Sequence, residues 1–181
     1  AIIGLEDAQV EQACAESAGN EVVSAVNYNA PGQVVIAGNA AAVERAIAAC
    51  KKLGAKKAMP LPVSVPFLCK LMKGAAEELG AALNEVSFND AVIPVIQNVT
   101  AKPELDRDNL KANLVRQLYS PVRWTDSVRT LVDQGVEQAV ECGAGRVLAG
   151  LIKRIDRRLP VHNIEKPDGL QSALAAVGKQ K

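Results

Sequence analysis

The sequence predicts an α/β protein with two parts, and three observations support this prediction. Residues 1–61 follow the order strand, helix, strand, strand, helix, strand, whereas residues 62–181 alternate single strands with helices. The composition is 49% hydrophobic but only 3% aromatic. The core must therefore be built from Ala, Val, Leu and Ile, which favours helices packed on short strands.

The first part is defined by helical spacing and by turn residues. Glu6 and Asp7 place negative charge where a helix begins, and Gly19 with Asn20 ends it. Pro31-Gly32 predicts a turn between two strands, and Asn39 is a suitable N-cap for the next helix. The predicted strands lie at about 1–5, 21–28, 33–37 and 55–61, and the helices at about 6–18 and 40–53. This order is the one found in ferredoxin-like folds.

The second part begins after three prolines, Pro60, Pro62 and Pro66, which predict a stiff connection. Apolar residues at helical spacing, including Leu68, Leu71 and Leu79, then predict a helix from Pro66 to about residue 83. The other predicted elements are a buried strand at 92–99, helices at 107–119 and 122–134, a strand at 136–141, a helix at 146–157, a strand at 159–164 and a helix at 168–177. Such alternation implies a parallel sheet covered by helices.

Composition and charge exclude several classes of protein. The formal net charge is +1, and the first part lacks the stacking aromatic residues of RNA-recognition modules, so we expect no nucleic-acid partner. Four widely spaced cysteines and a single histidine argue against a metal site and predict reduced thiols in the cytoplasm. The chain contains no apolar run long enough for a membrane span. Because it opens within a strand and without Met, we expect a fragment or a processed product.

Residues that could carry chemistry are few. The nucleophile elbow G-x-S-x-G is absent. The only histidine, His162, lies in a predicted strand, where a structural or solvent-exposed role is favoured over catalysis. Cys142 precedes a predicted helix, where a thiol pKa can fall, but a small core residue is the favoured interpretation. The glycines at 143, 145 and 150 do not fit the dinucleotide fingerprint and predict a tight turn, which could still present N–H groups to an anion.

Basic residues cluster in three places. One group is Arg146, Lys153, Arg154 and Arg157, a second is Lys51, Lys52, Lys56 and Lys57, and a third is Lys70 and Lys73. A solvated face is the favoured interpretation. The alternative is a surface that docks an acidic partner or the phosphates of coenzyme A.

Four stretches carry a resemblance to a known family. They are residues 26–38 (VNYNAPGQVVIAG), 60–66 (PLPVSVP), 115–124 (VRQLYSPVRW) and 141–148 (ECGAGRVL). In this order, and over nearly all 181 residues, the chain resembles the malonyl-CoA–acyl carrier protein transacylases. The resemblance implies a ferredoxin-like subdomain at 1–61 and, at 62–181, the C-terminal part of an α/β-hydrolase-like acyltransferase domain.

The resemblance also implies the reaction and the site. A serine in a G-H-S-L-G elbow takes malonyl from malonyl-CoA and passes it to acyl carrier protein, without a metal or a cofactor. That elbow, the arginine that holds the malonyl carboxylate and an early glutamine belong to the half that precedes Ala1, so that half is a possible partner. The catalytic histidine of the family falls at Leu68, and Gln117 matches the glutamine whose carbonyl orients it. Asn29 matches an asparagine near the substrate entrance, and Ala144 replaces the usual proline.

These matches predict a malonyl transferase fragment that is inactive alone, because leucine cannot accept a proton. One alternative is a non-catalytic module that binds carrier protein through its basic face. Another is that Leu68 is a changed residue in an otherwise normal enzyme. We also expect exposed strand edges near 92–99 and 136–141, and hence poor stability or self-association of the isolated chain.

Overall fold

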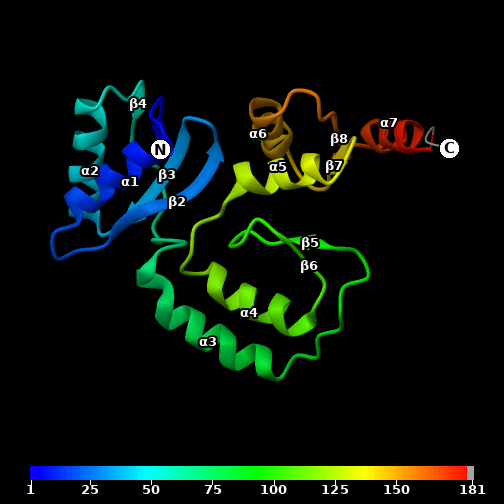
Figure 1. Cartoon of the computed structure of the whole chain (residues 1–181), viewed down its shortest axis with the longest axis horizontal. Helices are drawn as coiled ribbons and strands as arrows, with labels where there is room; N and C mark the ends of the chain where they lie inside the picture. Colours follow the sequence, from blue (N-terminus) through cyan, green and yellow to red (C-terminus); the bar gives the residue numbers. More distant parts are fainter. Residues whose placement is uncertain (179–181) are drawn as a thin grey trace. The chain divides into compact units, whose positions relative to one another are not determined.

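The computed structural model describes residues 1–178, which divide into two compact units, Ala1–Ser127 and Val128 onward (Figure 1). The boundary that the sequence places near residue 61 falls inside the first unit, and it stays a prediction. No helix among the described residues is long and apolar enough to cross a membrane.

The first unit begins with a four-stranded antiparallel sheet and two helices. In chain order the elements are β1 (Ile2–Ile3), α1 (Asp7–Ala18), β2 (Val23–Ala30), β3 (Gln33–Gly38), α2 (Ala40–Lys52) and β4 (Lys57–Ala58). The strand order across the sheet is β2-β3-β1-β4. The predicted order of strands and helices is therefore confirmed for this region (Figure 1).

These elements share one hydrophobic core. It is built from Ile2, Leu5, Val10, Ala13, Cys14, Val23, Ala25, Val34, Ile36, Ala42, Ala46, Cys50 and Ala58. Small residues on α1 and α2 allow the helices to approach the sheet closely. A side chain at Gly38 would be impossible without movement, because its Cβ would lie 1.9 Å from the carbonyl oxygen of Val22. Close packing thus explains the scarcity of large aromatic residues here.

Asn39 stands directly before α2, as predicted, but its side chain does not cap the helix. Its Oδ1 atom instead accepts a hydrogen bond from the backbone N–H of Val22, at 2.9 Å. The side chain therefore joins the start of α2 to the chain just before β2.

The rest of the first unit contains mostly helices and short strands. They are the 3-10 helix η1 (Lys70–Met72), α3 (Lys73–Asn84), β5 (Val95–Ile96), β6 (Pro103–Glu104), α4 (Arg107–Gln117) and the first residues of α5 (Trp124–Asp133), a helix that spans the boundary between the two units. The prediction of a helix from Pro66 is wrong, because regular helix begins only at Lys70. Leu68 is consequently not part of an apolar helical stripe. Its backbone φ of +62° is left-handed and incompatible with a right-handed helix.

The prediction of a buried strand at 92–99 is also wrong. Only Val95 and Ile96 are paired, in a two-stranded antiparallel sheet with β6. Val92 and Ile93 are 97% and 77% exposed. A short apolar run does not by itself reveal whether it is covered.

The second unit contains β7 (Ala139–Glu141), α6 (Val147–Ile155), β8 (Val161–Asn163) and α7 (Pro167–Val177). β7 and β8 pair in parallel, as the alternation of strands and helices predicts. The prediction of one parallel sheet over 62–181 is wrong for the described residues, because β5 pairs with β6 in a separate antiparallel sheet. The start of α7 lies close to β8, since a Cβ on Gly169 would come within 2.2 Å of the Asn163 carbonyl oxygen.

Candidate active site

Leu68 lies in a tight turn rather than on a regular element. The N–H of Phe67 donates to the Val65 carbonyl at 2.9 Å, and the thiol of buried Cys69 donates to the Pro66 carbonyl at 3.2 Å. Leu68 itself is half-buried, with a left-handed backbone. This conformation is costly for leucine and is adopted several times more readily by Asn, Asp and His. The turn therefore holds position 68 in a conformation that suits a polar side chain better than the leucine present.

Gln117 is the last residue of α4. A carbonyl at this position would accept from the N–H four residues later, but that residue is Pro121, which has no N–H. Because residue 121 is proline, the Gln117 carbonyl cannot accept the hydrogen bond from residue i+4 that an α-helix would supply.

The side chain of Gln117 reveals a residue that the sequence analysis missed. Its Oε1 atom accepts a hydrogen bond from Nδ2 of Asn98, at 3.3 Å, and the carbonyl of Asn98 accepts from the N–H of Arg123, at 3.0 Å. Asn98 thus ties the end of α4 to the residue that precedes α5. Its position in the short loop after β5 offers no pattern by which the sequence could have shown this role.

Asn29 lies at a β-bulge near the end of β2. Tyr28 pairs with Val34 and Ala30 pairs with Gln33, so Asn29 is an extra residue without a partner on β3. Bulges redirect side chains and are frequent beside active sites. Asn29 is half-buried. The bulge leaves Asn29 outside the pairing of β2 with β3, so its side chain need not follow the alternation of the strand.

Hydrogen bonds bring the strand that carries Asn29 to the segment that follows Gln117. The Tyr28 N–H donates to the Val122 carbonyl at 3.0 Å, and the Val122 N–H donates to the Val26 carbonyl at 2.9 Å. The Thr125 hydroxyl also donates to the Tyr28 carbonyl, at 3.1 Å. The structure therefore links two of the three predicted site segments.

Leu68 is not linked in this way. Within the described residues 1–178, no hydrogen bond joins Leu68 to Asn29 or to Gln117. A leucine side chain has no donor with which to reach the Gln117 carbonyl. The roles of all three residues stay predictions.

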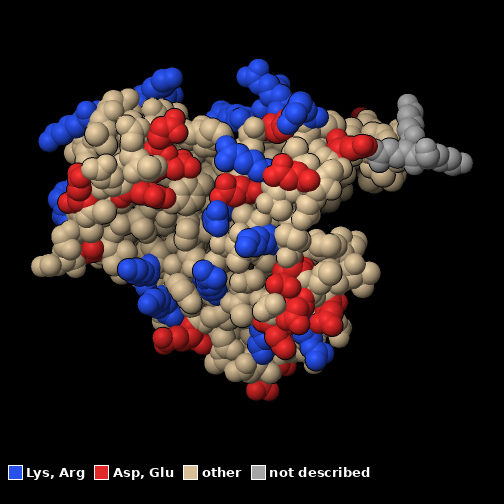
Figure 2. Space-filling model, in the orientation of Figure 1, with Lys and Arg blue, Asp and Glu red and all other residues tan. Residues whose placement is uncertain are grey.

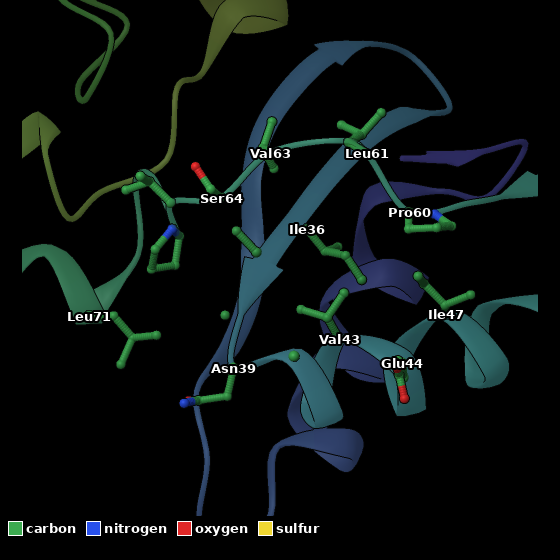
Figure 3. Close-up of a pocket in the computed structure, with 15 residues that line it drawn as sticks. Ile36, Asn39, Val43, Glu44, Ile47, Pro60, Leu61, Val63, Ser64 and Leu71 are labelled. Carbon is green, nitrogen blue, oxygen red and sulfur yellow. The ribbon is translucent and has the colours of Figure 1, made fainter.

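The turn at Leu68 borders a mostly apolar cavity of about 470 Å³ (Figure 3). Ile36 and Val43 line it from β3 and α2, and Leu61 and Val63 line it from the proline-rich segment. Ser64 adds a polar group to this lining. The cavity has the size and mixed character of a small-molecule site, although Leu68 itself is not among its lining residues.

The second unit holds the other sequence candidates, namely the turn at Gly143 and Gly145, Cys142 and His162. Both carboxylate oxygens of Glu141 accept hydrogen bonds from the start of α6, from the N–H groups of Leu148 at 2.9 Å and Ala149 at 3.0 Å. These amides are therefore not free to bind an anion. Cys142 is an exposed free thiol, contrary to the interpretation as a core residue. His162 is half-buried on β8.

No metal centre is evident in the described part of the chain, where no three His, Cys, Asp or Glu side chains gather closely enough to hold an ion. The expectation that no cofactor is used is not tested by this and stays a prediction.

Comparison with known proteins identifies relatives of the whole chain, although no protein-family model matches it. The malonyl CoA-acyl carrier protein transacylase of Escherichia coli K12 is 53% identical over 174 residues, which are 96% of this chain and 56% of that protein. The Staphylococcus aureus (strain COL) protein of the same name is 41% identical over 166 residues, 91% of this chain and 54% of that protein.

Solved structures agree. The acyl carrier protein S-malonyltransferase of Vibrio cholerae matches with a TM-score of 0.93 and 53% identity, covering 95% of this chain and 56% of that one. The chain is homologous to part of the malonyl CoA-acyl carrier protein transacylases. The family resemblance and the predicted α/β fold class are thereby confirmed.

A further transacylase structure was solved in a complex. It is described as a type II PKS acyl-carrier protein with its malonyl-transacylase, and it matches with a TM-score of 0.94 and 48% identity over 97% of this chain and 57% of that one. The chain thus spans about half the length of the transacylases that it matches.

Proposed function

We infer that this chain is part of an acyltransferase that moves malonyl from malonyl-CoA to acyl carrier protein, and that its 181 residues do not catalyse the transfer alone. The observation that carries the second statement is Leu68, which stands where the family resemblance places the catalytic histidine. The inferred setting is fatty-acid synthesis in the cytoplasm, with no metal or cofactor.

Acyl transfer through a serine needs a hydroxyl and a base that removes its proton. The printed sequence contains no G-x-S-x-G, and leucine cannot accept a proton. The serine elbow is therefore absent from these residues, and position 68 supplies no base.

The surroundings of Leu68 support the assignment of this position. Its left-handed backbone suits histidine better than leucine. The Gln117 carbonyl, released by Pro121, is a suitable acceptor for the second N–H of an imidazole, which fixes the tautomer of a catalytic base. Asn29, redirected by its bulge, is proposed to lie at the substrate entrance.

The test is transfer of labelled malonyl from malonyl-CoA to acyl carrier protein. The unchanged chain should give no more product than a blank and no covalent malonyl adduct. A labelled malonyl ester trapped on the unchanged chain would overturn the inference.

A second arm tests position 68 directly. Leu68→His should be compared with Leu71→His, each mixed with the part of the Escherichia coli relative that the match does not cover. Leu68→His should raise the transfer rate by about 10²–10⁴-fold over the unchanged chain, the usual contribution of a general base. The Leu71→His control should give no increase. An increased transfer rate would equally fit the alternative that Leu68 is a changed residue in a normal enzyme. If the transfer rate does not increase, position 68 has no role in the mechanism.

A non-catalytic module that binds carrier protein is the second candidate function. The exposed lysines at the end of α2, which make no ion pair with any described residue, favour it. Binding of acyl carrier protein that persists while Leu68→His never restores transfer would support this candidate instead.

A further inference from the structure

The geometry points to the end of α2 and β4 as the surface on which an acidic carrier protein docks. Its basic residues are Lys51, Lys52, Lys56 and Lys57, together called the α2–β4 lysine surface. This rests on the proposed function, since it assigns the contact surface for the protein substrate of that reaction.

The α2–β4 lysine surface carries positive charge that nothing in the structure neutralises. All four lysines are exposed, and within the described chain none makes an ion pair. Arg45, Arg123 and Arg158, in contrast, are each paired with a carboxylate. Basic side chains project at the upper left of Figure 2, above the end of α2 and β4 (compare Figure 1). Such a surface attracts an acidic protein and raises its association rate.

Apolar side chains lie among these charges. Leu53 is 48% exposed and Met59 is 44% exposed, and both belong to the same stretch of chain as the lysines. α2 and β4 are in contact, so the stretch folds back into one surface. Apolar contacts surrounded by polar groups are the usual anatomy of a protein interface.

The stem of one of the lysines lies against the backbone. A Cβ on Gly4 would lie 2.7 Å from Cγ of Lys56, so the aliphatic stem of Lys56 lies directly against the Gly4 backbone. A stem that packs against backbone has fewer rotamers to lose when the ammonium group binds a partner.

Two stability effects offer a simpler explanation for these lysines. Lys51 and Lys52 lie in the last turn of α2, where cations interact favourably with the helix dipole, and β4 is an edge strand, where lysine discourages aggregation. Both effects predict that charge reversal alters stability or solubility but leaves carrier-protein binding unchanged. The surface also contains no aromatic side chain between residues 51 and 59, which disfavours single-stranded nucleic acid as the partner.

The test measures the dissociation constant of the 181-residue chain for acyl carrier protein by titration at about 50 mM and 300 mM salt. The double variant Lys56→Glu with Lys57→Glu should raise this dissociation constant about tenfold at low salt. It should also make the dissociation constant less dependent on salt. The matched control, Lys153→Glu with Arg157→Glu on α6, carries the same change in charge and should alter it less than about threefold. Retained helical circular dichroism and a similar unfolding midpoint verify folding, and Lys56→Gln with Lys57→Gln serves if the double Glu variant does not fold.

An unchanged dissociation constant in the α2–β4 variants, or equal weakening in the control, would overturn the proposal. A second result would also overturn it. In that result, binding of single-stranded DNA or of free coenzyme A depends on Lys56 and Lys57, whereas binding of carrier protein does not. Binding is measured without any transfer reaction, so the two proposals fail separately. Docking that depends on these lysines stands even if Leu68→His restores no transfer. Undetectable binding at low salt overturns the docking proposal even if transfer is restored.

Discussion

Two regions of the first unit have similar apolar content but use it in opposite ways. Residues 1–58 bury, wholly or in part, their large aliphatic side chains except Leu53, and most of these pack in a single core against one sheet. Residues 59–105 leave most of theirs in contact with solvent, including Met59, Leu61, Val63, Val65, Phe67, Leu71, Val86, Val92, Ile93, Val95 and Leu105. The apolar side chains of residues 1–58 therefore pack mainly against one another, whereas most of the large apolar side chains of residues 59–105 remain exposed.

The difference follows from the elements in each region. The ferredoxin-like region pairs four strands and places α1 and α2 in contact with each other and with the sheet. In residues 59–105 the only sheet pairing is that of β5 with β6, two residues each, so little surface is available to bury side chains. In soluble proteins, exposed apolar patches are typical of surfaces that bind another molecule or aggregate.

The largest expected effect comes from replacing one isoleucine by alanine in each region and comparing the two losses of stability. Ile2→Ala removes a side chain that is 1% exposed in the middle of the sheet and should lower the free energy of unfolding by about 2–5 kcal/mol. Ile93→Ala removes the same atoms from a side chain that is 77% exposed and should change it by less than about 0.5 kcal/mol. Urea unfolding followed by circular dichroism measures both values.

Equal losses would show that residues 59–105 carry a core of their own in solution. Sedimentation of the Ile93→Ala protein adds a second reading, since the predicted self-association of the isolated chain should weaken when exposed apolar surface is removed.

The same contrast explains which parts of the fold could be predicted. α1 and α2 follow from apolar residues at helical spacing and from stop signals such as Gly19, because local pattern and tertiary packing agree there. Leu68 shares the spacing of the α3 stripe, but its turn is fixed by tertiary contacts such as that of Cys69 with the Pro66 carbonyl. Spacing alone cannot reveal that interruption.

The candidate site shows the same limit. Leu68, Gln117 and Asn29 came from motif matches, and the structure adds the turn, the bulge and the released carbonyl that surround them. Asn98 was missed because a single loop asparagine whose hydrogen bonds reach residues 19 and 25 positions later leaves no local pattern.

The second test concerns alkaline pH and the ferredoxin-like core. Burial, with smaller contributions from Cys50 and Glu11, raises the pKa of the Cys14 thiol from 9.0 to about 12. Between these values the unfolded chain releases a proton that the folded chain keeps. The free energy of unfolding should therefore fall as pH rises above 9, by at most about 1.4 kcal/mol per pH unit for this thiol.

Urea unfolding at pH 8 and pH 10, under reducing conditions, measures this slope. Cys14→Ala should flatten this slope, and Cys142→Ala, which removes an exposed thiol, serves as the control. Part of the slope should survive in Cys14→Ala, because burial also raises the pKa of Tyr28 and of Cys50. An identical slope in both variants would mean that Cys14 does not titrate differently in the folded state.

The smallest expected effect separates backbone conformation from burial at position 68. Leu68→Asn loses some apolar contact but relieves a left-handed conformation that costs leucine roughly 1–2 kcal/mol. Leu71→Asn, on the partly exposed 3-10 helix η1, loses apolar contact with no such relief. The Leu68→Asn protein should therefore be more stable than the Leu71→Asn protein by about 1 kcal/mol in urea unfolding. If the two are equally destabilised, the turn imposes no measurable strain on leucine, and the backbone argument for a polar residue at position 68 fails while the motif match remains.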